Sequence, residues 1–213
     1  MANEKKNEKN RNPIHIRCFR SESWLNKIDS LNEEDLDSRF IFSWIAFNSL
    51  YGQPKYLPHR EGSEVKDIEN FLSLMSDLDS TGQIQVPLKK EPLRGFAYDL
   101  TVDNYLNDGC WIAWYDRKLE TLLLREKNAY PKKRSGSILE NLFLSIYVLR
   151  KQIFHGCSSN MGSKNREALG RSLAILGKLI PIFIKIVGSN SNDLRLKKLL
   201  DDLPYPPTKG GTG

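Results

Sequence analysis

The sequence predicts an all-α fold, a bundle of four to five helices with one long inter-helix loop. Apolar side chains recur every three or four residues through most of the chain, which is the spacing of a helix face that packs on a core. No alternation of strand and helix patterns and no repeat period is present, which disfavours a parallel α/β sheet. A chain of 213 residues with 39% hydrophobic residues suits one domain with an ordinary core.

The helical pattern divides the chain into three parts. Residues 1–20 are expected to form a flexible N-terminal segment, because the first twelve are polar and charged and contain no apolar stretch. Residues 21–203 hold the helical domain. Residues 204–213 are expected to be a flexible tail, since their prolines and glycines cannot continue a helix. The start of the chain also lacks the pattern of a signal peptide, which predicts a cytoplasmic protein.

The first strong helix is expected from about residue 32 to residue 51. Ser30 and Glu33 have the spacing of a capping box, and Gly52 suits the C-terminal end. A second helix is expected from residue 63 to about residue 78. The apolar stripe of the first helix consists of Leu36, Phe40, Trp44, Phe47 and Tyr51.

Residues 79–101 are expected to form the long loop. They contain two prolines and two glycines that interrupt helices, and residues 83–86 alternate weakly enough to suggest a short extended piece. A third helix is expected over residues 103–128. Its apolar face would consist of Ile112, Tyr115, Leu119 and Leu122.

The last third of the chain contains the fourth and fifth expected helices. The fourth covers residues 137–154 and starts with a second capping box, formed by Ser137 and Glu140. After a polar loop, the fifth covers residues 166–187, where Pro181 is expected to kink or divide it. A short last turn is expected around residues 194–200.

Charge and composition set broad limits on function. The net charge of +6 and the isoelectric point near 9.1 are compatible with an anionic partner, although many proteins without one reach such values. The longest apolar run, residues 179–187, is interrupted by Pro181 and Lys185 and is too short to span a bilayer, so no membrane partner is expected. The three cysteines match no metal pattern, and phosphate-loop and serine-nucleophile motifs are absent, so no metal or cofactor is expected.

Arg150 is the most informative residue, because it lies on an apolar stripe. It follows Ile146 by four residues and precedes Ile153 by three. An arginine on such a stripe is usually either paired or functional. His155 follows five residues later, which places the two side chains about 140° apart around an ideal helix. Gly156 is placed to end the helix, so the last turn could unwind and bring the two groups together.

Two readings of this pair are open. In one, the guanidinium and imidazole groups of Arg150 and His155 handle a phosphate. In the other, Arg150 snorkels or pairs with an acid. His155 is then simply favoured by the helix dipole at a C-terminus.

Asn48 is a second polar residue on an apolar stripe. It lies four residues after Trp44 and three before Tyr51. A buried amide needs hydrogen-bond partners. Asn48 is therefore either a satisfied core asparagine or a residue that faces the Arg150 region and orients one of its groups.

Basic residues flank the candidate site. Lys132, Lys133 and Arg134 precede the fourth expected helix, and Lys164 lies in the polar loop that follows it. Lys151 adds a positive charge directly beside the stripe arginine. These five residues are candidates for holding a phosphate backbone, although most such charges are merely solvated.

Two segments resemble one known family. FSWIAFNSLYG, residues 42–52, resembles the first conserved helix of the Apea-like HEPN proteins. LRKQIFHG, residues 149–156, resembles the R-x4-6-H motif of that family, with four residues between Arg150 and His155. The order and the distance of the two segments also match, and the resemblance covers roughly residues 20–200.

The resemblance implies a HEPN-like helical bundle with a ribonuclease site. Many such domains are metal-independent ribonucleases of toxin–antitoxin, CRISPR or anti-phage systems, and in them the arginine and histidine of two subunits meet across a dimer interface. It therefore implies that Arg150 and His155 are catalytic, with Asn48 at the polar position of the first helix. RNA, a second copy of the chain and an antitoxin or defence-system protein are the implied partners. One departure is Lys151, where active members often have Asn, Asp or His.

The expected reaction is attack of an RNA 2′-hydroxyl on the adjacent phosphate, which yields a 2′,3′-cyclic phosphate. Histidine can donate or accept the protons, and arginine can bind the developing charge. Two alternatives remain open. One is a non-catalytic HEPN module that dimerises or docks a partner, with Arg150 in a structural ion pair. The other is a helical protein that binds nucleic acid through charge alone.

Overall fold

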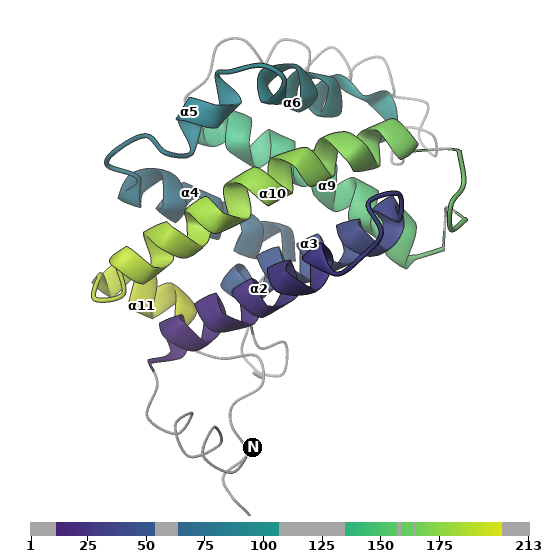
Figure 1. Cartoon of the computed structure of the whole chain (residues 1–213). Coiled ribbons are helices and arrows are strands. Elements are labelled where there is room, and N and C mark those ends of the chain that lie inside the picture. Colours follow the sequence, from purple (N-terminus) through teal and green to yellow (C-terminus); the bar gives the residue numbers. More distant parts are fainter. Residues whose placement is uncertain (1–11, 54–63, 107–134, 157–158, 164, 202–213) are drawn as a thin grey trace, which may run out of the picture.

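The computed structural model describes residues 12–53, 64–106, 135–156, 159–163 and 165–201. These residues form eight α-helices and one short 3₁₀ helix and contain no strand, so the predicted all-α class is confirmed. Labelled as in Figure 1, the helices are α2 (Pro13–Asp29), α3 (Leu36–Tyr51), α4 (Glu64–Leu78), α5 (Gln85–Leu88), α6 (Leu93–Val102), η1 (Asn104–Leu106), α9 (Ser135–Phe154), α10 (Arg166–Ser189) and α11 (Leu194–Leu200).

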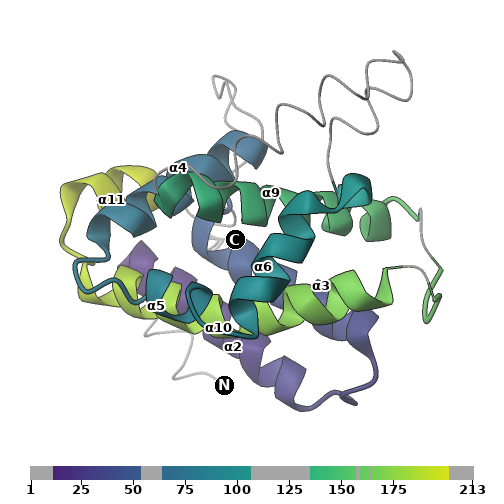
Figure 2. The ribbon, with the colours of Figure 1, turned by 90° about the horizontal axis from the view of Figure 1, so that it is seen from above.

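The bundle is organised around α10. This long helix crosses the front of the molecule in Figure 1 and packs against α2, α3 and α6, while α4 pairs with α9 behind it. Figure 2, seen from above, shows α6 crossing between α10 and α9, and α6 contacts both helices. The short α11 packs against α2 and α4.

The centre of the core is a group of aromatic rings around Phe47. The ring of Phe47 lies 5.9 Å from that of Phe71, 4.6 Å from that of Phe143 and 6.1 Å from that of Phe183, measured between centroids. These four fully buried rings come from α3, α4, α9 and α10. Aromatic contacts of this kind fix the relative rotation of the helices as well as burying area. The C-terminal part of α3 and the middle of α9 are thereby held next to the middle of α4.

Helix α2 corrects the predicted flexible segment at residues 1–20. It begins at Pro13, and the side chain of Asn12 accepts a hydrogen bond from the Ile14 N–H at 3.0 Å. Proline at the first helical position and asparagine before it are common helix-start signals. Residues 13–20 therefore belong to the bundle, with Ile14 and Arg17 fully buried. Arg17 and Ser21 lie on the buried face and weaken the apolar periodicity, so the sequence pattern does not predict this helix.

The expected start of the next helix was also wrong. Asp35, not Ser30, is the N-cap of α3, because its side chain accepts a hydrogen bond from the Ser38 N–H at 3.0 Å. Ser30 instead caps the C-terminus of α2. The predicted C-terminal end at Tyr51 and the end of α4 at Leu78 agree with the structure.

The long loop predicted over residues 79–101 is mostly helical. Pro87 lies in the first turns of α5, and Pro92 is the N-cap of α6. Proline is tolerated in both places, because the first turn of a helix does not use its backbone N–H groups as donors. The extended piece expected at residues 83–86 is likewise wrong, since α5 starts at Gln85. Of the third expected helix, the structure describes only η1 and Asp103, and residues 107–128 lie outside the described part.

Helices α9 and α10 agree closely with prediction, but Pro181 does not divide α10. The helix continues to Ser189. Gly177, four residues earlier, and Pro181 are both exposed, so the carbonyl that loses its helical partner faces water. Within the described residues, α10 is long and apolar enough to cross a membrane, a property that core helices of soluble bundles share.

Candidate functional site

Helix α9 places Arg150 at the edge of the core, opposite the start of α4. Its Nη1 atom lies 3.6 Å from Oε2 of Glu64, and the two side chains are 22% and 15% exposed. The preceding residues of the same apolar stripe, Leu139, Phe143 and Ile146, are fully or almost fully buried. The stripe therefore reaches the edge of the core at Arg150. The charge on the apolar stripe is thus explained by an acid partner at the rim.

The Glu64 carboxylate is held by two tyrosines. The Tyr51 hydroxyl donates to Oε1 at 3.1 Å, and the Tyr147 hydroxyl donates to Oε2 at 3.4 Å. Burial, and next the charge of Glu64, raise the pKa of Tyr51 well above its ordinary value, while Arg150 acts in the opposite direction. Tyr51 therefore stays a protonated donor. The end of α3, the start of α4 and the middle of α9 converge on this one carboxylate.

Aromatic rings flank the guanidinium group of Arg150. Its Cζ atom lies 4.7 Å from the centroid of Phe154 and 5.8 Å from that of Tyr147. The Nε atom is buried and has no hydrogen-bond partner among the described residues. An arginine has five N–H donors, and because Nε is buried, a phosphate could reach only those on the terminal nitrogens of this partly exposed side chain.

His155 is exposed one residue beyond the end of α9. Its backbone N–H still donates to the Lys151 carbonyl at 3.0 Å, and the Gly156 N–H donates to the Ile153 carbonyl at 3.1 Å. Gly156 ends the helix with φ of +71°. The last turn does not unwind before His155, so its side chain leaves α9 roughly 140° away from that of Arg150. One chain alone does not place both groups on one face of the helix.

Asn48 is not a buried amide, which corrects its predicted burial. It is exposed on α3, and its backbone carbonyl accepts a hydrogen bond from the Gly52 N–H at 2.7 Å. A Cβ atom at Gly52 would lie 3.0 Å from Oδ1 of Asn48, so the side chain lies over that glycine. Around α3, Asn48 is about 100° from Phe47 and about 60° from Tyr51, so it lies at the edge of the buried face and not at its centre.

The predicted phosphate-binding residues are only partly described. Lys151 is half-buried, and its Nζ atom lies 5.0 Å from the ring centroid of Tyr147. Lys132, Lys133, Arg134 and Lys164 lie outside the described residues.

The polar loop after His155 is tied to neighbouring elements by residues that the sequence did not single out. Asp37, buried in the first turn of α3, accepts a hydrogen bond from the Met161 N–H at 3.1 Å and forms a close ion pair with Arg166. Asn165 donates to Oε1 of Gln152 at 3.0 Å. Gln152 also donates to the Tyr105 carbonyl at 2.7 Å, so the loop is anchored on both α3 and α9.

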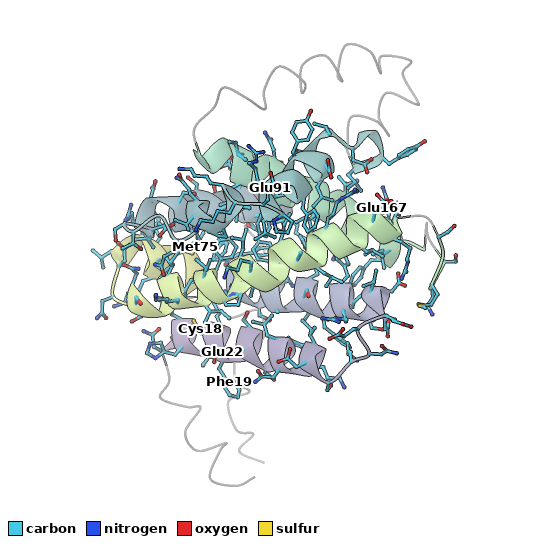
Figure 3. All side chains as sticks on the ribbon, turned by 45° about the horizontal axis from the view of Figure 1, so that its top comes forward. Cys18, Phe19, Glu22, Met75, Glu91 and Glu167 are labelled. Carbon is cyan, nitrogen blue, oxygen red and sulfur yellow. The ribbon has the colours of Figure 1, made fainter. Side chains whose placement is uncertain are left out.

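Cys18 has none of the features of a reactive thiol. It lies on α2 one turn before Glu22, as Figure 3 shows, and its Sγ donates to the Ile184 carbonyl at 3.8 Å. Burial, and next the charge of Glu22, raise the pKa of the thiol to about 11. The thiol therefore stays protonated near neutral pH, which makes it a poor nucleophile.

Glu64, Tyr51 and Tyr147 were missed as parts of the site. Tyr147 had a signal, because it precedes Arg150 by three residues and so shares its face of the helix. Glu64 had no such signal beyond its place in the first turn of a helix. Acids are common there because they interact favourably with the helix dipole. Only the packing of α4 on α9 brings it to Arg150.

The end of α9 thus carries a partly exposed guanidinium at Arg150 and an exposed imidazole at His155. Comparison of the chain with protein-family models, with curated proteins and with solved structures found no match. The family resemblance of the two segments therefore stays a prediction, and the function is proposed from the site.

Proposed function

We propose that this protein is a metal-independent endoribonuclease of the HEPN type, whose site is shared between two copies of the chain. The observation that carries the proposal is the state of Arg150. Its side chain is 22% exposed at the rim of the core, its Nη1 atom lies 3.6 Å from Glu64, and it stands on the last turn before an exposed histidine. Such a group can bind two oxygens of a phosphate at once.

The helical geometry of α9 supports a site made by two chains. Because Arg150 and His155 leave the helix about 140° apart, one phosphate cannot readily meet both side chains of one copy. A two-fold axis near the end of α9 would bring Arg150 of one copy toward His155 of the other. Phe154, which is 46% exposed beside Arg150, supplies apolar surface for such a contact.

The proposed reaction requires only proton transfers and charge stabilisation. One His155 imidazole accepts the proton of the 2′-hydroxyl, and the 2′-oxygen attacks phosphorus. The Arg150 guanidinium groups bind the oxygens that gain charge. The bond to the 5′-oxygen breaks, and the second His155 donates a proton to it. The products are a 2′,3′-cyclic phosphate and a 5′-hydroxyl.

The test is cleavage of a single-stranded RNA by the purified protein in EDTA, with the ends of the products identified by mass spectrometry. We expect cyclic phosphate ends from the wild type. Arg150→Ala and His155→Ala should each lower the rate about 100-fold or more, because each removes a group that acts on the transition state. Arg94→Ala should leave the rate unchanged, since Arg94 is an exposed arginine paired with Glu91 on the surface. Cleavage that requires added metal, or that survives both changes, overturns the proposal.

A second candidate function is favoured by the ion pair of Arg150 with Glu64. In a non-catalytic module that dimerises or docks a partner, this pair would simply join α9 to α4. That function predicts no RNA cleavage by the wild type. It also predicts that His155→Ala leaves the biological activity intact, whereas charged substitutions on the exposed apolar surface of Phe154 abolish it.

A further inference from the structure

We infer that Glu64 is a positioning residue that holds the guanidinium of Arg150 in the orientation needed to bind the scissile phosphate. The inference rests on the proposed ribonuclease function and adds a residue to its machinery. Glu64 lies 86 positions before Arg150 in the sequence and belongs to a different helix.

The first step concerns the rigidity of the carboxylate. Glu64 accepts hydrogen bonds from Tyr51 and Tyr147, whose side chains are buried in the aromatic core. The Tyr51 ring lies 6.3 Å from Phe71 and 6.4 Å from Trp44, so its hydroxyl is fixed by packing. A carboxylate bound at both oxygens has little freedom to rotate. It therefore offers a fixed negative charge at the start of α4.

The second step concerns the guanidinium. Glu64 attracts the Nη1 end of Arg150, and Phe154 covers the group at 4.7 Å. These two contacts restrain both the direction and the plane of the group. Arginine side chains lose much rotamer entropy when they are ordered. Ordering Arg150 before RNA binds removes that cost from the reaction and keeps its donors aligned.

The third step separates positioning from blocking. A charge-assisted hydrogen bond between nitrogen and carboxylate oxygen spans about 2.7–2.9 Å. The 3.6 Å separation from Glu64 is longer, so the carboxylate attracts the guanidinium without occupying a donor at close range. The Nε atom is buried, so the phosphate is expected to bind the terminal nitrogens of this partly exposed side chain. Glu64 thus leaves donors for the phosphate, which a blocking counter-ion would not do.

The test compares Glu64→Gln with the wild type in steady-state RNA cleavage in EDTA. Glutamine keeps the size of the side chain and an oxygen that can accept a tyrosine hydrogen bond, but it removes the charge that attracts Arg150. We expect kcat to fall about tenfold or more while KM changes by less than about threefold, because misalignment acts mainly on the transition state. In an Arg150→Lys background, Glu64→Gln should have a much smaller effect, since the two residues act as a unit.

Asp77→Asn is the matched control. Asp77 lies near the other end of α4 and also faces an arginine, Arg195, at 3.6 Å, but that pair is exposed. The two acids are separated by about 20 Å along the helix. Asp77→Asn should leave kcat and KM unchanged. If Glu64→Gln fails to fold, Tyr147→Phe is the second variant. It removes only a hydroxyl that holds the Glu64 carboxylate, and it should lower kcat several-fold.

The possible results are distinguishable. If Arg150→Ala abolishes cleavage but Glu64→Gln cleaves like the wild type, the positioning role is wrong and the ribonuclease proposal stands. If Glu64→Gln raises kcat, or tightens binding of an uncleavable 2′-deoxy strand, Glu64 is a blocking counter-ion and the inference is overturned. If wild-type protein does not cleave RNA in EDTA, both proposals fall together.

Discussion

At the scale of single residues, the largest predicted effect on the free energy of unfolding concerns Arg17. Its side chain is fully buried in α2, where Nε donates to the Leu200 carbonyl at 2.9 Å and Nη1 donates to the Gly52 carbonyl at 2.7 Å. Leu200 is the last residue of α11, and Gly52 directly follows the last residue of α3. The C-terminal end of a helix leaves carbonyl acceptors unpaired and carries partial negative charge. Arg17→Met should lower the free energy of unfolding by roughly 3 kcal/mol, because it leaves buried carbonyls without donors. Urea denaturation measures this loss.

The control for Arg17 is Arg94→Met. Arg94 forms a 2.7 Å ion pair with Glu91, but its side chain is 69% exposed. Exposed pairs of this kind contribute about 0–1 kcal/mol. Equal losses for the two variants would contradict the role assigned to Arg17.

Single residues also show where sequence reasoning succeeds and where it stops. The sequence singled out Arg150, because a charge on an apolar stripe needs a reason, and the structure gives one in Glu64. It misplaced Asn48, because spacing alone does not tell the centre of a buried face from its edge. It missed Arg17 as well, since a buried guanidinium that binds carbonyls of distant helices leaves no local pattern.

At the scale of elements, the loop between α9 and α10 depends on Asp37. The carboxylate binds Met161 and Arg166, while Met161 adopts a left-handed φ of 58° that a non-glycine residue rarely holds unaided. Asp37→Asn removes the charge that pairs with Arg166 but keeps an oxygen for the Met161 N–H. We expect a loss of about 1–2 kcal/mol in the stability of the loop. Hydrogen exchange at the amides of Met161 and Gly162 should therefore become roughly ten times faster.

Asp77→Asn serves as the comparison for this loop. It removes the carboxylate that pairs with Arg195, and neither residue belongs to the loop. Hydrogen exchange at the Met161 amide should therefore stay unchanged. If Asp37→Asn also leaves the exchange rate unchanged, the carboxylate is not the anchor.

The elements that the sequence predicted well are those whose buried face is mostly apolar and carries no fully buried charge. Helices α9 and α10 carry long stripes, and the predicted bounds differ from the observed ones by two residues at one end of each. The sequence did not predict α2, because the polar residues Arg17 and Ser21 lie on its buried face. The sequence does not predict α5 and α6, because Pro87 and Pro92 resemble helix breakers, although proline fits the beginning of a helix.

At the scale of the whole molecule, the separation of Arg150 and His155 around α9 predicts that the proposed ribonuclease activity requires two chains. The test mixes wild-type chains with a ninefold excess of the Arg150→Ala/His155→Ala double variant, allows subunits to exchange and measures cleavage at saturating RNA. Random pairing leaves about 1% of dimers fully wild type, whereas about 10% of the chains are wild type. Activity per wild-type chain should therefore fall about tenfold, because mixed dimers lack one arginine and one histidine. A mixture assayed before exchange controls for competition for RNA and should show no such fall. Activity proportional to the wild-type chain alone after exchange would mean that each copy acts by itself, and a site that contains Arg150 of one copy and His155 of another would then be wrong.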